Sequence, residues 1–253
     1  MMFSLDLATA DRLFPFVYLA MLAGPVTAGL LLTGLVKGRA GLREFRSRLF
    51  AWRVSVRWYL VALCTAPLMV ITTQLILSLA WPAFVPSIVG AADKAGLLAF
   101  GISVGLGAGF FEELGWTGFA TPELRRRAGI LRAGLTLGLL WSAWHFLAVL
   151  WGGGRAIGSA SPALFLAVDL CSALPVFRVL MVWVYDRTGS LLVAVLMHAS
   201  LTASVIVLGP AVTGPQTLIY DAALAAILWL LVSAIALSNR GRLVRAPLAH
   251  QAA

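Results

Sequence analysis

The feature that most constrains this chain is a succession of long apolar runs. Seven of them follow one another along the 253 residues, at about 14–36, 58–81, 95–116, 133–151, 162–184, 189–209 and 219–237. Most have close to the roughly 20 residues that a helix needs to cross the hydrocarbon core of a bilayer. We therefore predict that the chain crosses a membrane about seven times.

The composition excludes an ordinary soluble fold. Hydrophobic residues make up 61% of the chain and charged residues 11%, whereas soluble domains carry about 25% charged residues. Inside a bilayer every backbone amide needs an internal partner, and the alternating pattern of a closed barrel is absent. The sequence thus predicts an all-α, polytopic transmembrane helical bundle. Without linkers or a convincing repeat, residues 1–253 are expected to form a single membrane-embedded domain.

The excess of basic residues is expected to set the topology. If successive loops alternate between the two sides, one side receives 15 Lys and Arg residues and the other 3. Because cytoplasmic loops are enriched in Lys and Arg, we expect a multi-pass cell-membrane protein with its amino terminus outside and its carboxyl terminus in the cytoplasm. The net charge of +9 is then explained by contact with membrane lipid, and no nucleic-acid partner is expected.

Two of the basic segments have separate interpretations. Segment 39–57 mixes Arg with Leu, Phe and Trp, so it is expected to lie as an amphipathic helix on the inner leaflet. The arginine run 125–127 is interpreted as a solvated, lipid-facing cluster.

The few ionisable side chains within the spans are the candidate functional residues. Burying one at the bilayer centre costs about 2.5 to 3.5 kcal/mol on insertion scales, and such residues usually mark function. They are Glu112, Glu113, His145, Asp169, Arg178 and His198. Asp169 and Arg178 are interpreted mainly as structural residues that pair with neighbouring helices. The two glutamates and two histidines form the candidate site.

A face of small residues explains how the glutamates could be held. Gly101, Gly105 and Gly109 repeat at four-residue spacing, which allows another helix to approach closely. Glu112 and Glu113 follow Gly109 by three and four residues, so the same face is expected to direct them into the bundle.

The two histidines also share helix faces with polar or aromatic residues. Trp141 and His145 lie four residues apart in the run WSAWH, and His198 and Thr202 have the same spacing. Residues at this spacing are neighbours on a helix surface, so a hydroxyl is expected beside the second imidazole.

Three motifs together resemble the CPBP family of intramembrane proteases, which comprises the CAAX prenyl endopeptidases and their bacterial relatives, including bacteriocin-immunity proteins. They are EELGWTG at 112–118, WSAWH at 141–145 and DRTGSLLVAVLMHASLTAS at 186–204. The family pattern is a Glu-Glu pair followed by an Arg, an aromatic-xxx-His, and a His-xxx-Asn or Asp. The resemblance covers about 95–205 and implies an intramembrane endopeptidase acting on membrane-associated or prenylated-type substrates.

The sequence departs from this pattern at two positions. Thr117 stands where the Arg is expected, and Thr202 stands where the Asn or Asp is expected. Thr117 cannot neutralise Glu113 as an Arg four residues later would. We therefore expect the glutamate pair either to share a proton or to take its counter-charge from elsewhere. Thr202 can still donate a hydrogen bond.

The residues and the resemblance together imply a set of roles. Glu112 would be the general base that activates water, and His145 would orient that water. Glu113 would support Glu112 or the packing, while His198 with Thr202 would stabilise the tetrahedral oxyanion.

Other chemistries and classes remain open at this point. A divalent metal such as zinc could be held by Glu112, His145 and His198, although their spacing is not diagnostic and no HExxH motif is present. A serine peptidase is disfavoured because no GxSxG-like elbow occurs. The alternative functions are a proton-coupled transporter and a non-catalytic membrane chaperone or immunity factor.

Overall fold

The computed structural model describes residues 7–151 and 161–238, without the side chains of a few of them. Its elements are, in chain order, α1 (Leu7–Leu49), α2 (Val56–Ser78), α3 (Ser87–Gly90), α4 (Lys94–Gly115), the π-helical turn η1 (Trp116–Ala120), α5 (Thr121–Arg125), α6 (Ile130–Trp151), α7 (Pro162–Cys171), α8 (Ala173–Thr188), α9 (Leu191–Leu208) and α10 (Pro215–Ser238). No strand occurs in the described residues. The predicted all-α class is confirmed.

Six helical segments within the described residues are long and apolar enough to cross a bilayer. They are Pro15–Leu49, Val56–Ser78, Lys94–Arg125, Pro162–Thr188, Leu191–Leu208 and Pro215–Ser238. Each coincides with one of the predicted runs. The remaining run, 133–151, coincides with the backbone of α6, whose last side chains lie outside the described residues. The chain is thus a multi-pass membrane protein built as a helical bundle.

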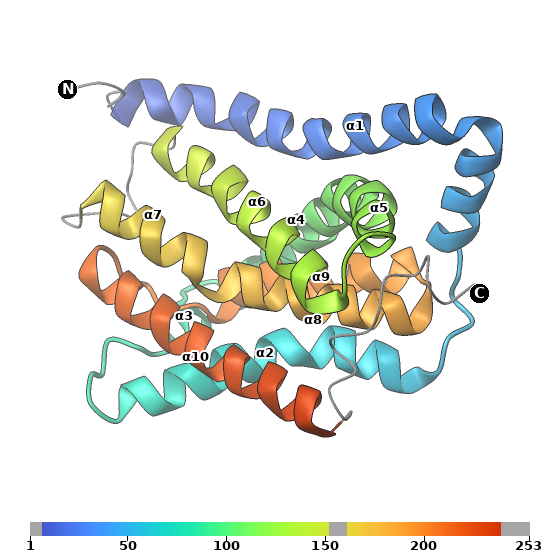
Figure 1. Ribbon diagram of the computed structural model, residues 1–253. Coiled ribbons are helices and arrows are strands. Elements are labelled where there is room, and N and C mark those ends of the chain that lie inside the picture. The colour runs from blue at the N-terminus through green and yellow to red at the C-terminus, as the bar shows by residue number, and fades with distance from the viewer. Residues whose placement is uncertain (1–6, 152–160, 239–253) are drawn as a thin grey trace.

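The first predicted span continues further than expected. Element α1 reaches Leu49 but consists of two helical parts that meet at a kink at Gly38. The bend of α1 is visible in Figure 1. Gly38 has a φ of 59°, which glycine adopts without the steric cost that a Cβ would add. Segment 39–57, expected to be an amphipathic helix, is therefore helical only as far as Leu49 before α2 begins.

The fifth predicted span is divided into two helices. Helix α7 ends at Cys171 and α8 begins at Ala173, with Ser172 in non-helical backbone between them. Pro175 explains the break, because proline has no backbone N–H to donate to the carbonyl of Cys171 and its ring clashes there.

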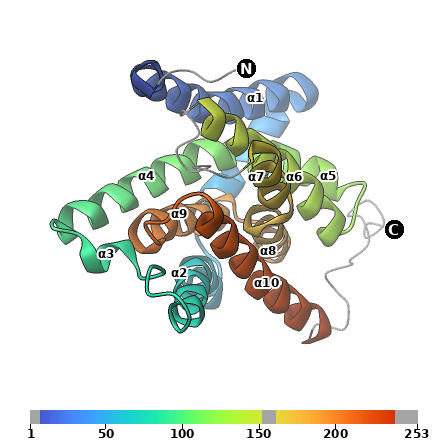
Figure 2. The same cartoon turned by 90° about the vertical axis from the view of Figure 1, so that its left-hand side faces the viewer.

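Helices α8 and α9 form the centre of the bundle. Nearly every side chain of α8 from Pro175 to Tyr185 is buried, and α9 packs against both α4 and α2. In Figure 2, α1 lies across the top and α2 and α10 lie below, with α8 and α9 between them. Residues carried by α8 and α9 are therefore the most shielded from lipid.

The contact between α4 and α9 uses the predicted small face. A Cβ atom built at Gly105 would lie 2.5 Å from the carbonyl oxygen of Ala199, and one at Gly109 would lie 2.5 Å from that of Val195. No side chain larger than hydrogen fits at either position without moving backbone. The glycines therefore bring the glutamate end of α4 directly against α9.

The basic loops meet at one end of the bundle. Lys37 pairs with Glu123 at 2.6 Å, and Arg48 donates to the hydroxyl of Tyr185 at 2.7 Å. These contacts join the loops that the charge count assigned to one side. Which side of the membrane this is stays a prediction.

One basic residue at this end behaves differently from the prediction. Arg126 is 63% exposed, as expected, but Arg125 is 1% exposed and pairs with Asp186 at 2.7 Å. The interpretation of 125–127 as a solvated cluster is wrong for Arg125, because the Asp186 carboxylate on α8 supplies a partner that the sequence run does not show.

Candidate active site

The two glutamates lie at the end of α4, where the regular helix gives way to the π-helical turn. Glu112 is 3% exposed and Glu113 is fully buried. The backbone N–H of Trp116 donates to the carbonyls of both residues. Single π turns inside helices are frequent at functional sites because they re-aim side chains. Here the turn places Thr117 back over Glu113.

Glu113 is surrounded by donors from three helical segments. The Nη1 of Arg178 on α8 donates to Oε1 at 2.9 Å and to Oε2 at 2.8 Å. The Nδ1 of His198 on α9 donates to Oε1 at 2.7 Å, and the hydroxyl of Thr117 donates to Oε2. A carboxylate has about four lone-pair sites, so Glu113 has no acceptor left for a water molecule.

Glu112 has a different environment. Its Oε2 accepts a hydrogen bond from the indole Nε1 of Trp141 at 2.9 Å. Its Oε1 lies 4.0 Å from the Nε2 of His145, which is too long for a direct hydrogen bond. One oxygen of Glu112 is thus held in place while the other faces an imidazole across a gap.

The backbone sets which nitrogen of His145 faces that gap. Its Nδ1 lies 2.9 Å from the carbonyl oxygen of Trp141. A carbonyl can only accept, so Nδ1 carries the hydrogen, and Nε2 of the neutral ring is the acceptor that faces Glu112. The His145 side chain is 31% exposed, so this member of the pair reaches the surface of the bundle while Glu112 is buried.

Trp141 connects the members of the site. Its ring lies 5.1 Å from that of His145 and 5.0 Å from that of His198, both in edge-on geometry. The guanidinium of Arg178 lies over its face, 4.1 Å from the ring centroid. A cation over an indole face is an attractive arrangement. The fully packed indole therefore holds the spacing between the two halves of the site.

The structure brings four of the predicted site residues together and leaves one apart. Glu112 and His145 form one pair, and Glu113 and His198 form the other. Thr202 is partly exposed on α9, and the described residues show no hydrogen bond to it. Asp169 has a side chain outside the described residues.

Arg178 is the site residue that sequence reasoning missed. The sequence favours a mainly structural role for it, yet it is fully buried and contacts Glu113 directly. The signal was present in the sequence as a lone arginine inside an apolar span together with the missing arginine at Thr117. A counter-charge from elsewhere is one of the two alternatives that the sequence leaves open, and Arg178 provides it.

The residues do not gather as the zinc site that the sequence left open. Among the described residues, no group of three or more His, Cys, Asp or Glu side chains comes together to hold a metal ion. The physical reason is that His198 directs Nδ1 at Glu113, while His145 faces Glu112. We therefore derive no step through a metal.

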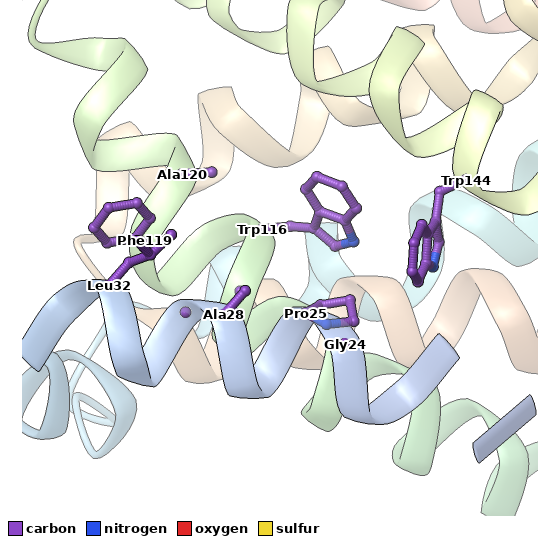
Figure 3. Close-up of a pocket in the computed structure, with 10 residues that line it drawn as sticks. Gly24, Pro25, Ala28, Leu32, Trp116, Phe119, Ala120 and Trp144 are labelled. Atoms are coloured by element: carbon purple, nitrogen blue, oxygen red, sulfur yellow. The ribbon is translucent and has the colours of Figure 1, made fainter. Parts of the chain in front are cut away.

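An apolar groove lies beside the site between α1, η1 and α6. It has a volume of about 380 Å³ and is lined by Gly24, Pro25, Ala28, Gly29, Leu32, Gly115, Trp116, Phe119, Ala120 and Trp144. Figure 3 shows the indoles of Trp116 and Trp144 next to each other above Pro25 and Gly24. Trp116 follows the glutamate pair and Trp144 precedes His145, so the groove and the site share the same helices.

Comparison with known proteins agrees with this geometry. Residues 94–204 match the family described as Type II CAAX prenyl endopeptidase Rce1-like. The match supports the resemblance of that stretch to the CPBP family. One relative, the CAAX prenyl protease 2 of Methanococcus maripaludis, is 46% identical over 39 residues, which are 15% of this chain and 14% of the relative. The aligned part is thus a small fraction of the relative's length.

The CPBP match covers every residue of the site. Helix α4, the π turn, α6 and α8 lie inside 94–204, as does α9 up to Ser204. The groove wall supplied by α1 lies outside the matched range. The CPBP core therefore contains the polar site, while a separate helix completes the apolar surface next to it.

Proposed function

We propose that this protein is an intramembrane endopeptidase that hydrolyses a peptide bond with water activated by Glu112. The observation that supports this best is the contrast between the two glutamates. All acceptor sites of Glu113 are occupied, whereas Oε1 of Glu112 faces the Nε2 of His145 across 4.0 Å. A water molecule between those two acceptors can donate one hydrogen to each.

The chemical step follows from that placement. Glu112 takes a proton from the water as its oxygen attacks the scissile carbonyl carbon, and His145 holds the other hydrogen and orients the attack. The carbonyl oxygen becomes an oxyanion. When the tetrahedral intermediate collapses, the C–N bond breaks and Glu112 returns the proton to the leaving amine. No other co-reactant is required.

The oxyanion is stabilised in this proposal by the second pair of residues. Because Nδ1 of His198 is committed to Glu113, its Nε2 can donate to an oxyanion only when the ring is the imidazolium. Thr202, four residues later on α9, is the second proposed donor. Preorganised donors of this kind are often the largest single contribution to catalysis.

The proposed substrate is a membrane-associated peptide or protein, including prenylated-type substrates. The apolar groove supports this proposal because of its lining. Eight of the lining residues are glycine or have apolar side chains, and the other two are tryptophans. An apolar chain attached to a peptide would lie in the groove while the peptide reaches the polar site. With the amino terminus outside, this end of the bundle faces the cytoplasm.

The proposal is tested with the purified full chain in liposomes and matched peptide libraries, with and without a prenyl group. We expect cleavage by the wild type and a loss of about a thousandfold or more with Glu112→Gln, since removal of a general base typically costs 10²–10⁴-fold. Gln keeps an oxygen that can accept from Trp141. Glu123→Gln is the matched control, because Glu123 pairs with Lys37 at the surface.

The outcomes separate the alternatives. Equal cleavage by Glu112→Gln and the wild type would show that Glu112 is not the base. Cleavage that stops on addition of a chelator would favour the metal-dependent alternative. A correctly inserted wild type that cleaves no peptide in either library would favour the non-catalytic chaperone or immunity factor, and proton-coupled uptake would favour the transporter.

A further inference from the structure

Glu113 needs a counter-charge, and its own helix does not supply one. The side chain is fully buried, and an unpaired carboxylate in such a place is strongly unfavourable. The family motif would place an arginine four residues later, where this chain has Thr117. The cation comes instead from Arg178 on α8, at 2.9 and 2.8 Å from the two carboxylate oxygens.

Thr117 and Arg178 converge on the same atom. The hydroxyl of Thr117 and the Nη1 of Arg178 both donate to Oε2 of Glu113. A side chain at position 117 therefore already points at the carboxylate that a motif arginine would neutralise. An arginine at either position 117 or position 178 could therefore supply the positive charge that pairs with Glu113.

We propose that Arg178 is the positioning residue that replaces the missing motif arginine. This rests on the proposed function in one respect, the role of His198 toward the substrate. Arg178 holds Glu113, and Glu113 in turn holds Nδ1 of His198 at 2.7 Å. The ring is thereby fixed with Nδ1 on Glu113, which leaves Nε2 for the oxyanion of the proposed function.

The same guanidinium also supports the other half of the site. Its carbon lies 4.1 Å from the centroid of the Trp141 ring, and that indole donates to Glu112 at 2.9 Å. Arg178 thus contacts one glutamate directly and reaches the other through a single side chain. A purely structural ion pair elsewhere in the bundle would have no such connection.

Only a small part of the guanidinium is used, which makes relocation feasible. Nε and Nη2 of Arg178 have no hydrogen-bond partner in the part of the chain that the structure describes. Nη1 alone makes the contact with Glu113. An arginine introduced at position 117 must therefore rebuild one contact, and shortening Arg178 to Gln releases the volume that it needs.

The experiment moves the cation back to the motif position. Arg178→Gln is compared with the double variant Arg178→Gln/Thr117→Arg for turnover, for insertion into liposomes, and for the tautomer of His198 by nitrogen-15 NMR of labelled histidine. We expect Arg178→Gln to lower kcat by roughly a hundredfold, as a 1 Å misplacement does, with little change in KM. The double variant is expected to recover at least a tenth of the wild-type kcat.

A second buried arginine provides the matched control. Arg125 is 1% exposed and pairs with Asp186 at 2.7 Å, away from the glutamate pair. Arg125→Gln is expected to reduce accumulation in the membrane, and adding Thr117→Arg is expected to give no recovery. Recovery in that background as well would show a general effect of the new arginine and would overturn the proposal.

The remaining outcomes also decide the matter. If Arg178→Gln has the wild-type kcat, Arg178 is only a structural ion-pair partner. The same conclusion follows if the double variant recovers accumulation in the membrane but not kcat. If Arg178→Gln does not accumulate, relocation is supported only when the double variant recovers both accumulation and kcat. If neither variant accumulates, relocation is overturned. If the wild type cleaves no peptide, the proposed function fails, and the His198 tautomer alone tests Arg178. If the wild-type tautomer of His198 is lost in Arg178→Gln and returns in the double variant, the positioning role of Arg178 is supported.

Discussion

The packing of α4 against α9 gives a prediction that the structure makes quantitative. Gly109 and Gly107 lie two residues apart on the same helix. A Cβ at Gly109 would lie 2.5 Å from the backbone carbonyl oxygen of Val195 and 2.9 Å from the backbone nitrogen of Ala199. A Cβ at Gly107 would meet nothing within 4 Å. The same substitution, Gly to Ala, therefore has opposite consequences at the two positions.

The size of the effect follows from these distances. Ordinary van der Waals contact begins near 3.4 Å, so α4 must retreat by about 0.9 Å to accept Gly109→Ala, because backbone atoms cannot move aside as a side chain can. Overpacking of this kind costs about 1 to 3 kcal/mol. Gly107→Ala only removes the helix penalty of glycine and is expected to stabilise by roughly 0.5 to 1 kcal/mol.

The displacement is expected to reach the active site. Glu113 follows Gly109 by one helical turn, and its Oε1 lies 2.7 Å from Nδ1 of His198 on α9. If the whole displacement of α4 is transmitted to Glu113, the distance between Oε1 and Nδ1 becomes longer than a normal hydrogen bond. We expect Gly109→Ala to lower turnover by about a hundredfold.

Thermal unfolding in detergent and peptide cleavage in liposomes check both effects. Gly107→Ala serves as the control, with a Tm equal to or above that of the wild type and unchanged turnover. The reasoning is refuted if Gly109→Ala matches Gly107→Ala in both measurements, since the close approach of α4 and α9 would then not exist.

Three further predictions concern other parts of the chain. Arg125→Ala is expected to destabilise the bundle by about 3 to 5 kcal/mol because it breaks a buried ion pair by removing one member, which thermal unfolding measures; a change below 1 kcal/mol would contradict the burial of this pair. In a cysteine-free background, Cys introduced at Ala92 is expected to react with an impermeant reagent from outside and Cys at Ser238 only after permeabilisation, and the reverse pattern would invert the orientation. Thr202→Val is expected to slow turnover ten- to a thousandfold if the hydroxyl helps to hold the oxyanion, whereas Thr202→Asn keeps a donor and retains activity; equal rates for Val and wild type would remove Thr202 from the site.

The membrane-spanning character could be predicted from sequence alone, and so could the four ionisable residues of the candidate site that the structure brings together. Helix formation in a bilayer depends on the length of each apolar run, which is a local property. The glycine face of α4 could also be predicted, because the spacing of Gly101, Gly105 and Gly109 puts them on one side whatever the partner helix is. The pairing of that face with α9 came from the structure.

The ends of the helices were harder to predict because they depend on single residues. Gly38 has non-helical backbone angles and kinks α1 into two helical parts, the second of which ends at Leu49. Pro175 divides the fifth span at Ser172. Neither feature changes the hydropathy of its run, so the apolar pattern does not show it.

What the sequence determined by itself is which residues are costly in a bilayer, since that cost depends on the side chain and its depth and not on its neighbours. What only the tertiary structure decided is how those costs are offset. Arg178 reaches Glu113 from another helix, and Arg125 reaches Asp186 in the same way. Such pairs depend on how helices pack, and the one-dimensional spacing of residues within a helix carries no information about them.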